Sequence, residues 1–225
     1  DWIPHGYDPK IFQPRPRTAG RKIIGIENTD LMIGCVMTNQ TRKDWGLAFS
    51  TMAELRPRHP HLQFWAHVDA LEREWSLPAL VEDFGLQNHV RVTLSGEYSS
   101  EQLSYLYSAC DLTILPSLGE GFGYPIVESL ACGVPVLHGN YAAGVDLIPM
   151  KDWLIDPAAH RLESPWNCLR PVYDPRDWAA RIEKVVGELD GGTPDMCTRA
   201  VEHLKWENLW PSCWKKWLLA GIESR

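Results

Sequence analysis

The sequence predicts an α/β fold in which about six parallel strands form a single doubly wound sheet. Three observations support this. Short apolar runs of strand length recur along the chain, stretches of helical character separate most of them, and a glycine-rich turn joins one run to a helix. Strands that alternate with helices build parallel sheets covered on both faces. With 225 residues the chain is long enough to bury one sizeable core.

The expected elements follow from these patterns in order. The predicted strands are residues 33–37, 62–68, 90–94, 112–115, 134–137 and 153–155. The predicted helices are residues 44–55, 77–84, 100–109, 124–132, 141–148 and 175–189. Two of them have start signals, Ser99 or Ser100 as a cap and Asp174 followed by Pro175. Ligands bind beyond the carboxyl ends of such strands, which is where the glycine turn after Leu115 falls.

The two ends of the chain differ from this alternating pattern. Residues 1–30 lack sustained periodicity, contain several prolines and carry a basic cluster, so we expect a solvated, linker-like segment before a regular domain at 31–225. The cluster consists of Arg15, Arg17, Arg21 and Lys22. Near the C-terminus, tryptophans at spacings of three and four form an apolar stripe around Trp210 and Trp214. This stripe either packs on its own domain, which is the commoner case, or covers a separate domain and leaves aromatic surface exposed.

Bulk properties exclude several functional classes. A net charge of −7 and a pI near 5.6 argue against a nucleic-acid or anionic-membrane surface. No stretch approaches the roughly 20 apolar residues that span a bilayer. The six cysteines are widely spaced with no short paired spacing, which is typical of reduced core residues. We therefore expect a soluble, cytoplasmic protein.

The most informative segment is residues 115–128, because two carboxylates flank a glycine turn that opens a helix. Gly119, Gly121 and Gly123 let backbone amides approach an anion, and the helix N-terminus adds positive potential. Glu120 and Glu128 are expected to face one crevice, where carboxylates accept hydrogen bonds from sugar hydroxyls but repel phosphate. The ligand that this pattern favours is a diphosphate flanked by two polyols, as in a nucleotide sugar.

The segment Glu120-Gly-Phe-Gly-Tyr-Pro-Ile-Val-Glu128 resembles the glutamate, seven residues, glutamate signature of retaining GT-B glycosyltransferases. This group has two facing Rossmann domains and includes glycogen synthases and phosphatidylinositol mannosyltransferases. The resemblance extends to the sequence on both sides of the signature, at residues 96–111 and 131–136. Residues 3–14 resemble the family's linker into its C-terminal domain, and Trp206-Glu207 resembles the start of its closing helix. The resemblance implies a Rossmann-like, C-terminal donor-binding half of a GT-B fold, with the acceptor held by an N-terminal domain or subunit.

The resemblance also implies roles for the residues of the turn. Glu120 would contact the transferred sugar and stabilise positive charge at its anomeric carbon, and Glu128 would hold the ribose. The backbone of Gly121, Phe122, Gly123 and Tyr124 would bind the diphosphate, with Phe122 beside the sugar. The alternatives are that Glu120 is an exposed turn residue and that Glu128 caps its own helix.

Residues after the other strands complete the expected site. Asn39, Arg42 and Lys43 follow the first strand, and Lys43 matches the lysine of the family's cationic pair. The arginine that the family often carries five or six residues earlier is replaced by Met37 and Thr38, so Arg42 would have to compensate. The alternative for Arg42 and Lys43 is an exposed helix-start pair.

The stretch Leu94, Ser95 and Gly96 would approach the nucleobase through its backbone, which leaves the identity of the base open. His138 follows the fifth strand and borders the same crevice, although a satisfied loop histidine is the commoner case.

Other nucleotide and metal sites fit poorly. A dinucleotide fingerprint requires a third glycine where Tyr124 stands, and it belongs after the first strand. No triphosphatase loop is present, and His59, His61 and the cysteines lack metal-site spacing. We therefore expect a retaining, metal-independent glycosyltransferase domain whose donor is a nucleotide-diphosphate sugar, with no other cofactor. The alternative is a non-catalytic nucleotide-sugar-binding or subunit-interaction module. The acceptor, whether glycan, lipid or protein, stays open.

Overall fold

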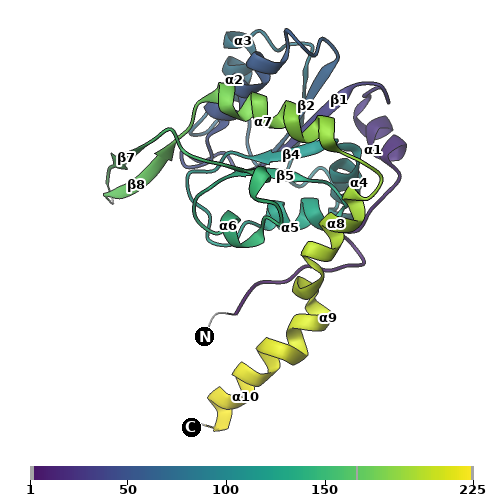
Figure 1. The fold of residues 1–225 in the computed structure, drawn as a ribbon, viewed down its shortest axis with the longest axis vertical. Coiled ribbons are helices and arrows are strands. Elements are labelled where there is room, and N and C mark those ends of the chain that lie inside the picture. The colour runs from purple at the N-terminus through teal and green to yellow at the C-terminus, as the bar shows by residue number, and fades with distance from the viewer. Residues whose placement is uncertain (1–2, 166, 224–225) are drawn as a thin grey trace.

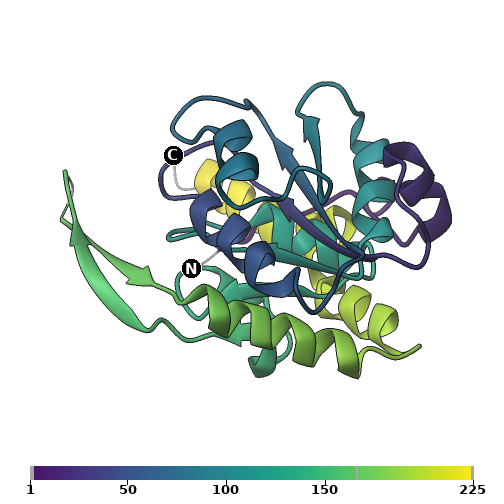
Figure 2. The ribbon, with the colours of Figure 1, turned by 90° about the horizontal axis from the view of Figure 1, so that it is seen from above.

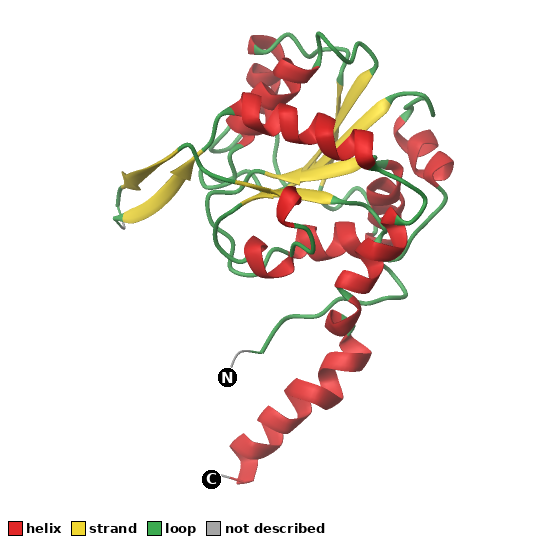
Figure 3. Ribbon diagram, in the orientation of Figure 1, coloured by secondary structure: helices red, strands yellow, loops and turns green. Residues whose placement is uncertain are grey.

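Six parallel strands form the central sheet of the computed structural model, which describes residues 3–165 and 167–223 (Figures 1 and 3). The strand order is β3-β2-β1-β4-β5-β6. Their bounds are β1 Leu31–Val36, β2 Leu62–Val68, β3 Val90–Leu94, β4 Leu112–Leu115, β5 Val136–Gly139 and β6 Leu154–Ile155. Every adjacent pair is parallel. This confirms the predicted α/β fold class with one Rossmann-like, doubly wound sheet.

Helices cover both faces of this sheet (Figures 1 and 2). On one side α2 packs against both α3 and α7, and on the other α5 packs against α4 and α8, with α1 against α4. The bounds of these helices are α1 Arg17–Ile24, α2 Trp45–Leu55, α3 Leu77–Asp83, α4 Ser100–Ala109, α5 Tyr124–Ala131, α7 Pro175–Glu188 and α8 Thr193–Ala200. Ser99 caps α4 and Asp174 caps α7, as the start signals predicted.

Strand β1 begins two residues earlier than predicted, and two other predicted elements have different bounds for identifiable reasons. Strand β5 begins at Val136, two residues later than predicted, because Val134 N–H still closes the end of α5 on Ser129 O and Pro135 has no N–H to donate. The helix predicted at 141–148 shrinks to α6, Gly144–Leu147. Ala142 has a left-handed φ of 59°, which interrupts a helix before that point.

Helix α1 lies within the segment that the sequence analysis treated as a solvated linker. Arg21 of the basic cluster is fully buried and donates hydrogen bonds to Ala109 O at 3.1 Å and to Asp111 Oδ2 at 3.0 Å. A Cβ at Gly20 would overlap Tyr105 O, so glycine permits the close approach of α1 to α4. Arg21 of the basic cluster is therefore not solvated, whereas Arg17 and Lys22 of the same cluster are exposed. Whether residues 1–30 form a linker from a preceding domain stays a prediction.

A two-stranded antiparallel hairpin stands out from the body of the domain (Figures 1 and 2). It consists of β7, Ala159–Glu163, and β8, Cys168–Val172, and the sequence analysis did not predict it. Leu162 and Leu169 pair across it and are 68% and 54% exposed. Most of its residues face solvent on both sides, so the sequence has no alternating apolar pattern that would reveal a strand.

The C-terminal residues form a nearly continuous helical arm that runs away from the sheet (Figure 1). It comprises α9, Trp206–Leu209, a π-helical turn, Trp210–Trp214, and α10, Lys215–Glu223. The tryptophan stripe packs on its own domain only in part, and whether it covers a separate domain stays a prediction. Leu209 is buried and Trp214 packs against the core, whereas Trp210 and Trp217 are 53% and 56% exposed.

Candidate functional site

A cavity of about 730 Å³ opens beyond the carboxyl ends of the central strands. The cavity is lined by the segments that follow β1 and β4, by the ends of β2 and β3, by residues of α4 and α5, and by the N-terminal residues 3–5. Those that carry the argument are Thr38, Arg42, Lys43, His67, Ser95, Glu120, Gly121, Phe122, Gly123, Tyr124 and Glu128. Both carboxylates of the signature therefore face one cavity, as predicted.

The glycine turn presents backbone donors to this cavity. Gly123 is the N-cap residue of α5 and has a φ of 96°, a conformation that favours glycine, and the helix begins at Tyr124. Within the described residues, the N–H groups of Gly121, Phe122, Gly123 and Tyr124 donate no hydrogen bond to the protein. A Cβ at Gly121 would meet open space. Unpaired amides at a helix N-terminus form a receptor for an anion.

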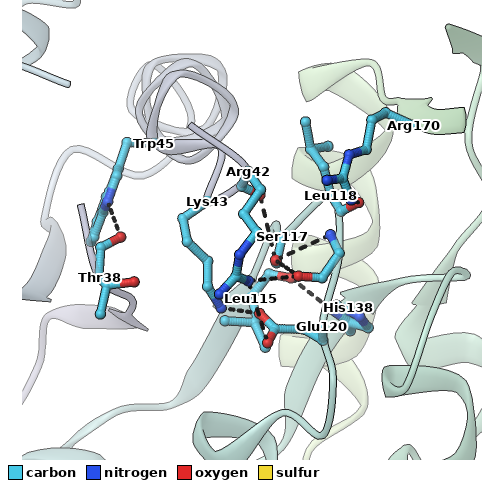
Figure 4. Close-up of polar contacts among 11 residues, drawn as sticks. Thr38, Arg42, Lys43, Trp45, Leu115, Ser117, Leu118, Glu120, His138 and Arg170 are labelled. Carbon is cyan, nitrogen blue, oxygen red and sulfur yellow. Dashed lines mark hydrogen bonds and ion pairs between the residues drawn. The ribbon is translucent and has the colours of Figure 1, made fainter. Parts of the chain in front are cut away.

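Lys43 and Glu120 form an ion pair at the edge of the cavity, between the Lys43 ammonium and Glu120 Oε1 (Figure 4). Each side chain is 7% exposed. Burial lowers the pKa of Lys43, and the neighbouring Glu120 carboxylate offsets part of this effect. Neither residue is the exposed surface group that the alternative interpretation would require.

Arg42 lies beside this pair. Its Nη1 donates a hydrogen bond to Gly119 O at 2.6 Å and lies 3.8 Å from Glu120 Oε2. The backbone of the same loop is tied to the segment after β4, since Leu118 N–H donates to Arg42 O at 2.8 Å. Two loops far apart in sequence thus bring two cations and one carboxylate to one edge of the cavity.

Glu128 extends from α5 into the cavity and accepts a hydrogen bond from the Tyr107 hydroxyl at 2.8 Å. Burial raises the pKa of this carboxyl to about 7, and the Tyr107 hydrogen bond counteracts part of the rise. No side-chain cap is present at the start of α5, so Glu128 does not cap its own helix. Its second oxygen accepts no hydrogen bond from the described residues and can take one from a ligand.

The remaining predicted residues lie in different positions. Ser95 lines the cavity, whereas Leu94 and Gly96 are outside its lining. The Asn39 side chain is fully buried and organises the loop after β2, since it donates to Ala70 O and Trp75 O and accepts from Trp75 N–H. His138 is also fully buried behind the site, with Nδ1 2.6 Å from Leu115 O, and burial lowers its pKa. The structure therefore does not bring Asn39 or His138 to the cavity surface.

Further residues at the site were not predicted, and His67, Tyr107 and His5 are the most informative of them. His67, at the end of β2, lies with Nδ1 2.8 Å from Thr93 Oγ1 and Nε2 3.3 Å from Ser95 Oγ. Tyr107 holds Glu128, and His5 packs its ring 5.3 Å from that of Phe122 and 5.6 Å from that of Tyr124. Only His67 could have been predicted from the sequence, because it lies at the carboxyl end of a predicted strand.

Comparison with known proteins identifies the family. The family model described as Glycosyl transferases group 1 matches residues 16–162. The chain belongs to this family. A D-inositol 3-phosphate glycosyltransferase from Mycobacterium sp. (strain KMS) is 30% identical over 203 residues, which cover 90% of this chain and 42% of that protein. An MMP alpha-(1->4)-mannosyltransferase from Mycolicibacterium hassiacum is 32% identical over 142 residues, 63% of this chain and 31% of that protein. The chain thus spans less than half the length of these group 1 relatives.

Solved structures of glycosyltransferases share this fold. Sucrose-phosphate synthase from Thermosynechococcus elongatus aligns with a TM-score of 0.76 at 20% identity, covering 97% of this chain and 52% of that one. Anabaena HepE in complex with UDP and glucose aligns at 0.73 and 17% identity, covering 98% and 56%. The C-terminal domain of LpcC, a group 1 protein from Francisella tularensis, aligns at 0.66 and 18% identity, covering 88% and 96%. The predicted half of a GT-B fold is therefore confirmed.

Two kinds of feature are absent from the part of the chain that the structure describes. Among residues 3–165 and 167–223, no helix combines the length and apolar character needed to cross a membrane. The same part of the chain contains no cluster of three or more His, Cys, Asp or Glu side chains arranged to hold a metal ion.

Proposed function

We propose that the cavity binds a nucleotide-diphosphate sugar and that the chain is the donor half of a retaining glycosyltransferase. The observation that carries this proposal is the set of unpaired amides at residues 121–124, which lies between the Lys43–Glu120 ion pair and Glu128 in one cavity. Family membership supports sugar transfer, and the HepE complex with UDP and glucose supports a nucleotide sugar as the donor.

Each part of the donor has a matching group. The amides and the end of the α5 dipole receive the diphosphate, and Lys43 and Arg42 neutralise charge that develops as it leaves. Glu128 accepts hydrogen bonds from the ribose, and Glu120 contacts the sugar. Ser95 and its neighbours adjoin the base. Because amides and cations supply the positive potential, the proposed reaction needs no metal.

Retention follows from attack on the face from which the diphosphate leaves, with a diphosphate oxygen taking the acceptor proton. Glu120 stabilises the cationic sugar in the transition state, so no protein nucleophile is required. The acceptor is held by a second domain or subunit in attacking geometry. The buried thiols of Cys35 and Cys110 suit a reducing compartment, and we place the reaction in the cytoplasm.

Titration calorimetry with UDP, GDP and ADP and their sugar conjugates tests the donor site directly. We expect one nucleotide series to bind, Lys43→Ala to weaken that binding about tenfold, and Glu120→Gln to leave nucleoside-diphosphate binding within a few-fold. A donor-hydrolysis or transfer assay then separates the functions, since Glu120→Gln should suppress turnover far more than binding. Binding without any turnover would favour a non-catalytic module. If no nucleotide binds, the donor site is rejected.

A further inference from the structure

The β7–β8 hairpin reaches the turn that carries Glu120 through one side chain. Arg170, on β8, donates a hydrogen bond from Nη1 to Leu118 O at 2.9 Å (Figure 4). The same guanidinium lies directly over Gly119, where an added Cβ would overlap Nη1. Arg170 itself is not part of the cavity lining. It therefore contacts the backbone just before Glu120 and not the space that a ligand would fill.

Two guanidinium groups hold this short backbone segment from different elements. Arg42, from the loop after β1, donates to Gly119 O at 2.6 Å, and Arg170 donates to Leu118 O. Ser117 Oγ also donates to Gly119 O at 3.1 Å. Successive carbonyls before Glu120 are thus each fixed by a charged donor, and charge-assisted hydrogen bonds are stronger than neutral ones.

Arg170 also faces a carboxylate on the neighbouring strand. Its Nε lies 3.5 Å from Glu163 Oε2 on the paired strand, and its side chain is 21% exposed. The hairpin is tied to the domain by the Tyr141 hydroxyl, which donates to Leu169 O at 2.7 Å. At the base of the hairpin, Ala158 N–H donates to Val172 O at 2.8 Å and extends the ladder between its strands. The hairpin is therefore a support for Arg170, although its outer residues face solvent.

The diphosphate receptor is anchored separately from this segment. Ile126 N–H donates to Gly123 O at 2.9 Å, which ties the amides of residues 121–124 to α5. Loosening the Leu118–Gly119 peptides should therefore move Glu120 more than the amides. Since Glu120 faces the sugar and the amides face the diphosphate, the two halves of the donor should respond differently.

We propose that Arg170 is a positioning residue that holds Glu120 in register with the donor sugar through the Leu118–Gly119 backbone. The proposal rests on the proposed function, because it assigns the sugar to Glu120. It gives the hairpin a role at the site. Among the described residues, no hairpin side chain lines the cavity, so this role is exerted through the backbone of the turn.

The test compares a nucleoside diphosphate with its sugar conjugate. Arg170→Leu is expected to leave the Kd of UDP, or of whichever diphosphate the wild type binds, within twofold, and to raise the Kd of the conjugate about tenfold. Arg170→Lys keeps one donor for Leu118 O and should restore the conjugate to within about threefold. Arg161→Leu is the matched control, since Arg161 is the cross-strand partner of Arg170 and is 59% exposed. Equal loss for both ligands, or no loss for either, would overturn the positioning role.

Hydrogen exchange provides a readout that needs no ligand. In Arg170→Leu, the amides of Leu118, Gly119 and Glu120 should exchange faster, while those of β1 and α5 keep their protection. Tyr141→Phe, which removes a tie of the hairpin and keeps Arg170, should have the same effect on a smaller scale. Unchanged exchange in both variants contradicts the proposal. A wild type that binds no sugar nucleotide rejects the proposed function instead, and the exchange data still decide whether Arg170 holds the turn.

Discussion

The Lys43 ammonium and the Glu120 carboxylate are buried against each other across 77 positions of sequence. Burial alone would favour a neutral lysine, and the carboxylate counteracts this. The carboxylate therefore helps to keep Lys43 charged at the cavity edge, where its ammonium can interact with a phosphate. A diphosphate that binds the Lys43 ammonium would weaken its pairing with Glu120. The Glu120 carboxylate could then turn toward a sugar.

Breaking this pair should destabilise the fold. Glu120→Gln leaves two cations near the cavity without their carboxylate, and we expect the free energy of unfolding to fall by roughly 3 kcal/mol. Lys43→Met should cost less, because Arg42 remains 3.8 Å from Glu120. The double variant should lose less than the sum of the single losses. Urea denaturation of the four proteins at pH 7 measures this cycle.

An exposed ion pair supplies the control for that experiment. Lys184 and Asp152 lie 2.6 Å apart with side chains 46% and 57% exposed, so Lys184→Met should change the unfolding midpoint little. Strict additivity of the Lys43 and Glu120 variants would show that the pair contributes no coupling to stability.

Stability should also depend on pH through Glu128. Its pKa is about 7 in the folded protein, against 4.5 for the ordinary group. The folded state therefore binds more protons between these values, and stability from this residue falls as pH rises through about 7. Glu128→Gln removes the dependence, so its stability relative to wild type should increase from pH 5 to pH 8. Urea titrations across that range test the sign, and a constant difference would contradict it.

Binding of ribose to Glu128 predicts proton release. A hydroxyl that donates to the ionised carboxylate lowers its pKa, so nucleotide binding near pH 6.5 should expel protons. Calorimetry of wild type in two buffers with different ionisation enthalpies measures the number released. Glu128→Gln should abolish the release. If the variant releases as many protons as wild type, they come from a group other than Glu128.

The sequence was informative where structure is local. The strand–turn–helix at residues 112–131 was predicted because an apolar run, closely spaced glycines and Pro125 each constrain the backbone within a few positions. Glu120 and Lys43 were predicted as site residues because they match the family's signature glutamate and its lysine, and both follow strand ends of the same sheet. The predicted helix and strand limits failed mainly at Pro135 and Ala142, where single backbone conformations decide the boundary.

Other features depend on distant partners that no local pattern reveals. Tyr107 lies on a predicted helix, but its contact with Glu128 follows from how α4 packs on α5. Arg21 is buried because Asp111 and backbone carbonyls satisfy it, whereas composition alone places arginine at the surface. Arg170 lies on a hairpin with no inward face, and only the fold brings it to Leu118.

Glycine substitutions should separate folding from binding. Gly121→Ala places a methyl group in open space, so thermal stability should be unchanged while diphosphate affinity falls about tenfold, if the ligand occupies that space. Gly123→Ala forces a left-handed alanine at a φ of 96° and should cost about 1–2 kcal/mol. Gly187→Ala, in α7 with nothing near its Cβ, should leave affinity intact. Unimpaired binding by Gly121→Ala would move the diphosphate away from this turn.

A third cation can be added at the position where the family pattern has an arginine and this chain has Thr38. Thr38 is exposed at the cavity, and its carbonyl, not its side chain, accepts the Trp45 indole hydrogen bond at 3.3 Å. Thr38→Arg should therefore fold normally and bring a guanidinium to the diphosphate, tightening nucleotide binding about tenfold at low salt, with less gain at high ionic strength.

Calorimetry at two salt concentrations measures the gain, and Gln40→Arg, which adds the same charge outside the cavity lining, is the control. If both variants tighten binding equally, the attraction is long-range and net charge accounts for it. If only Thr38→Arg does so, the diphosphate lies next to residue 38, and Lys43 and Arg42 leave part of its charge unneutralised in the natural sequence.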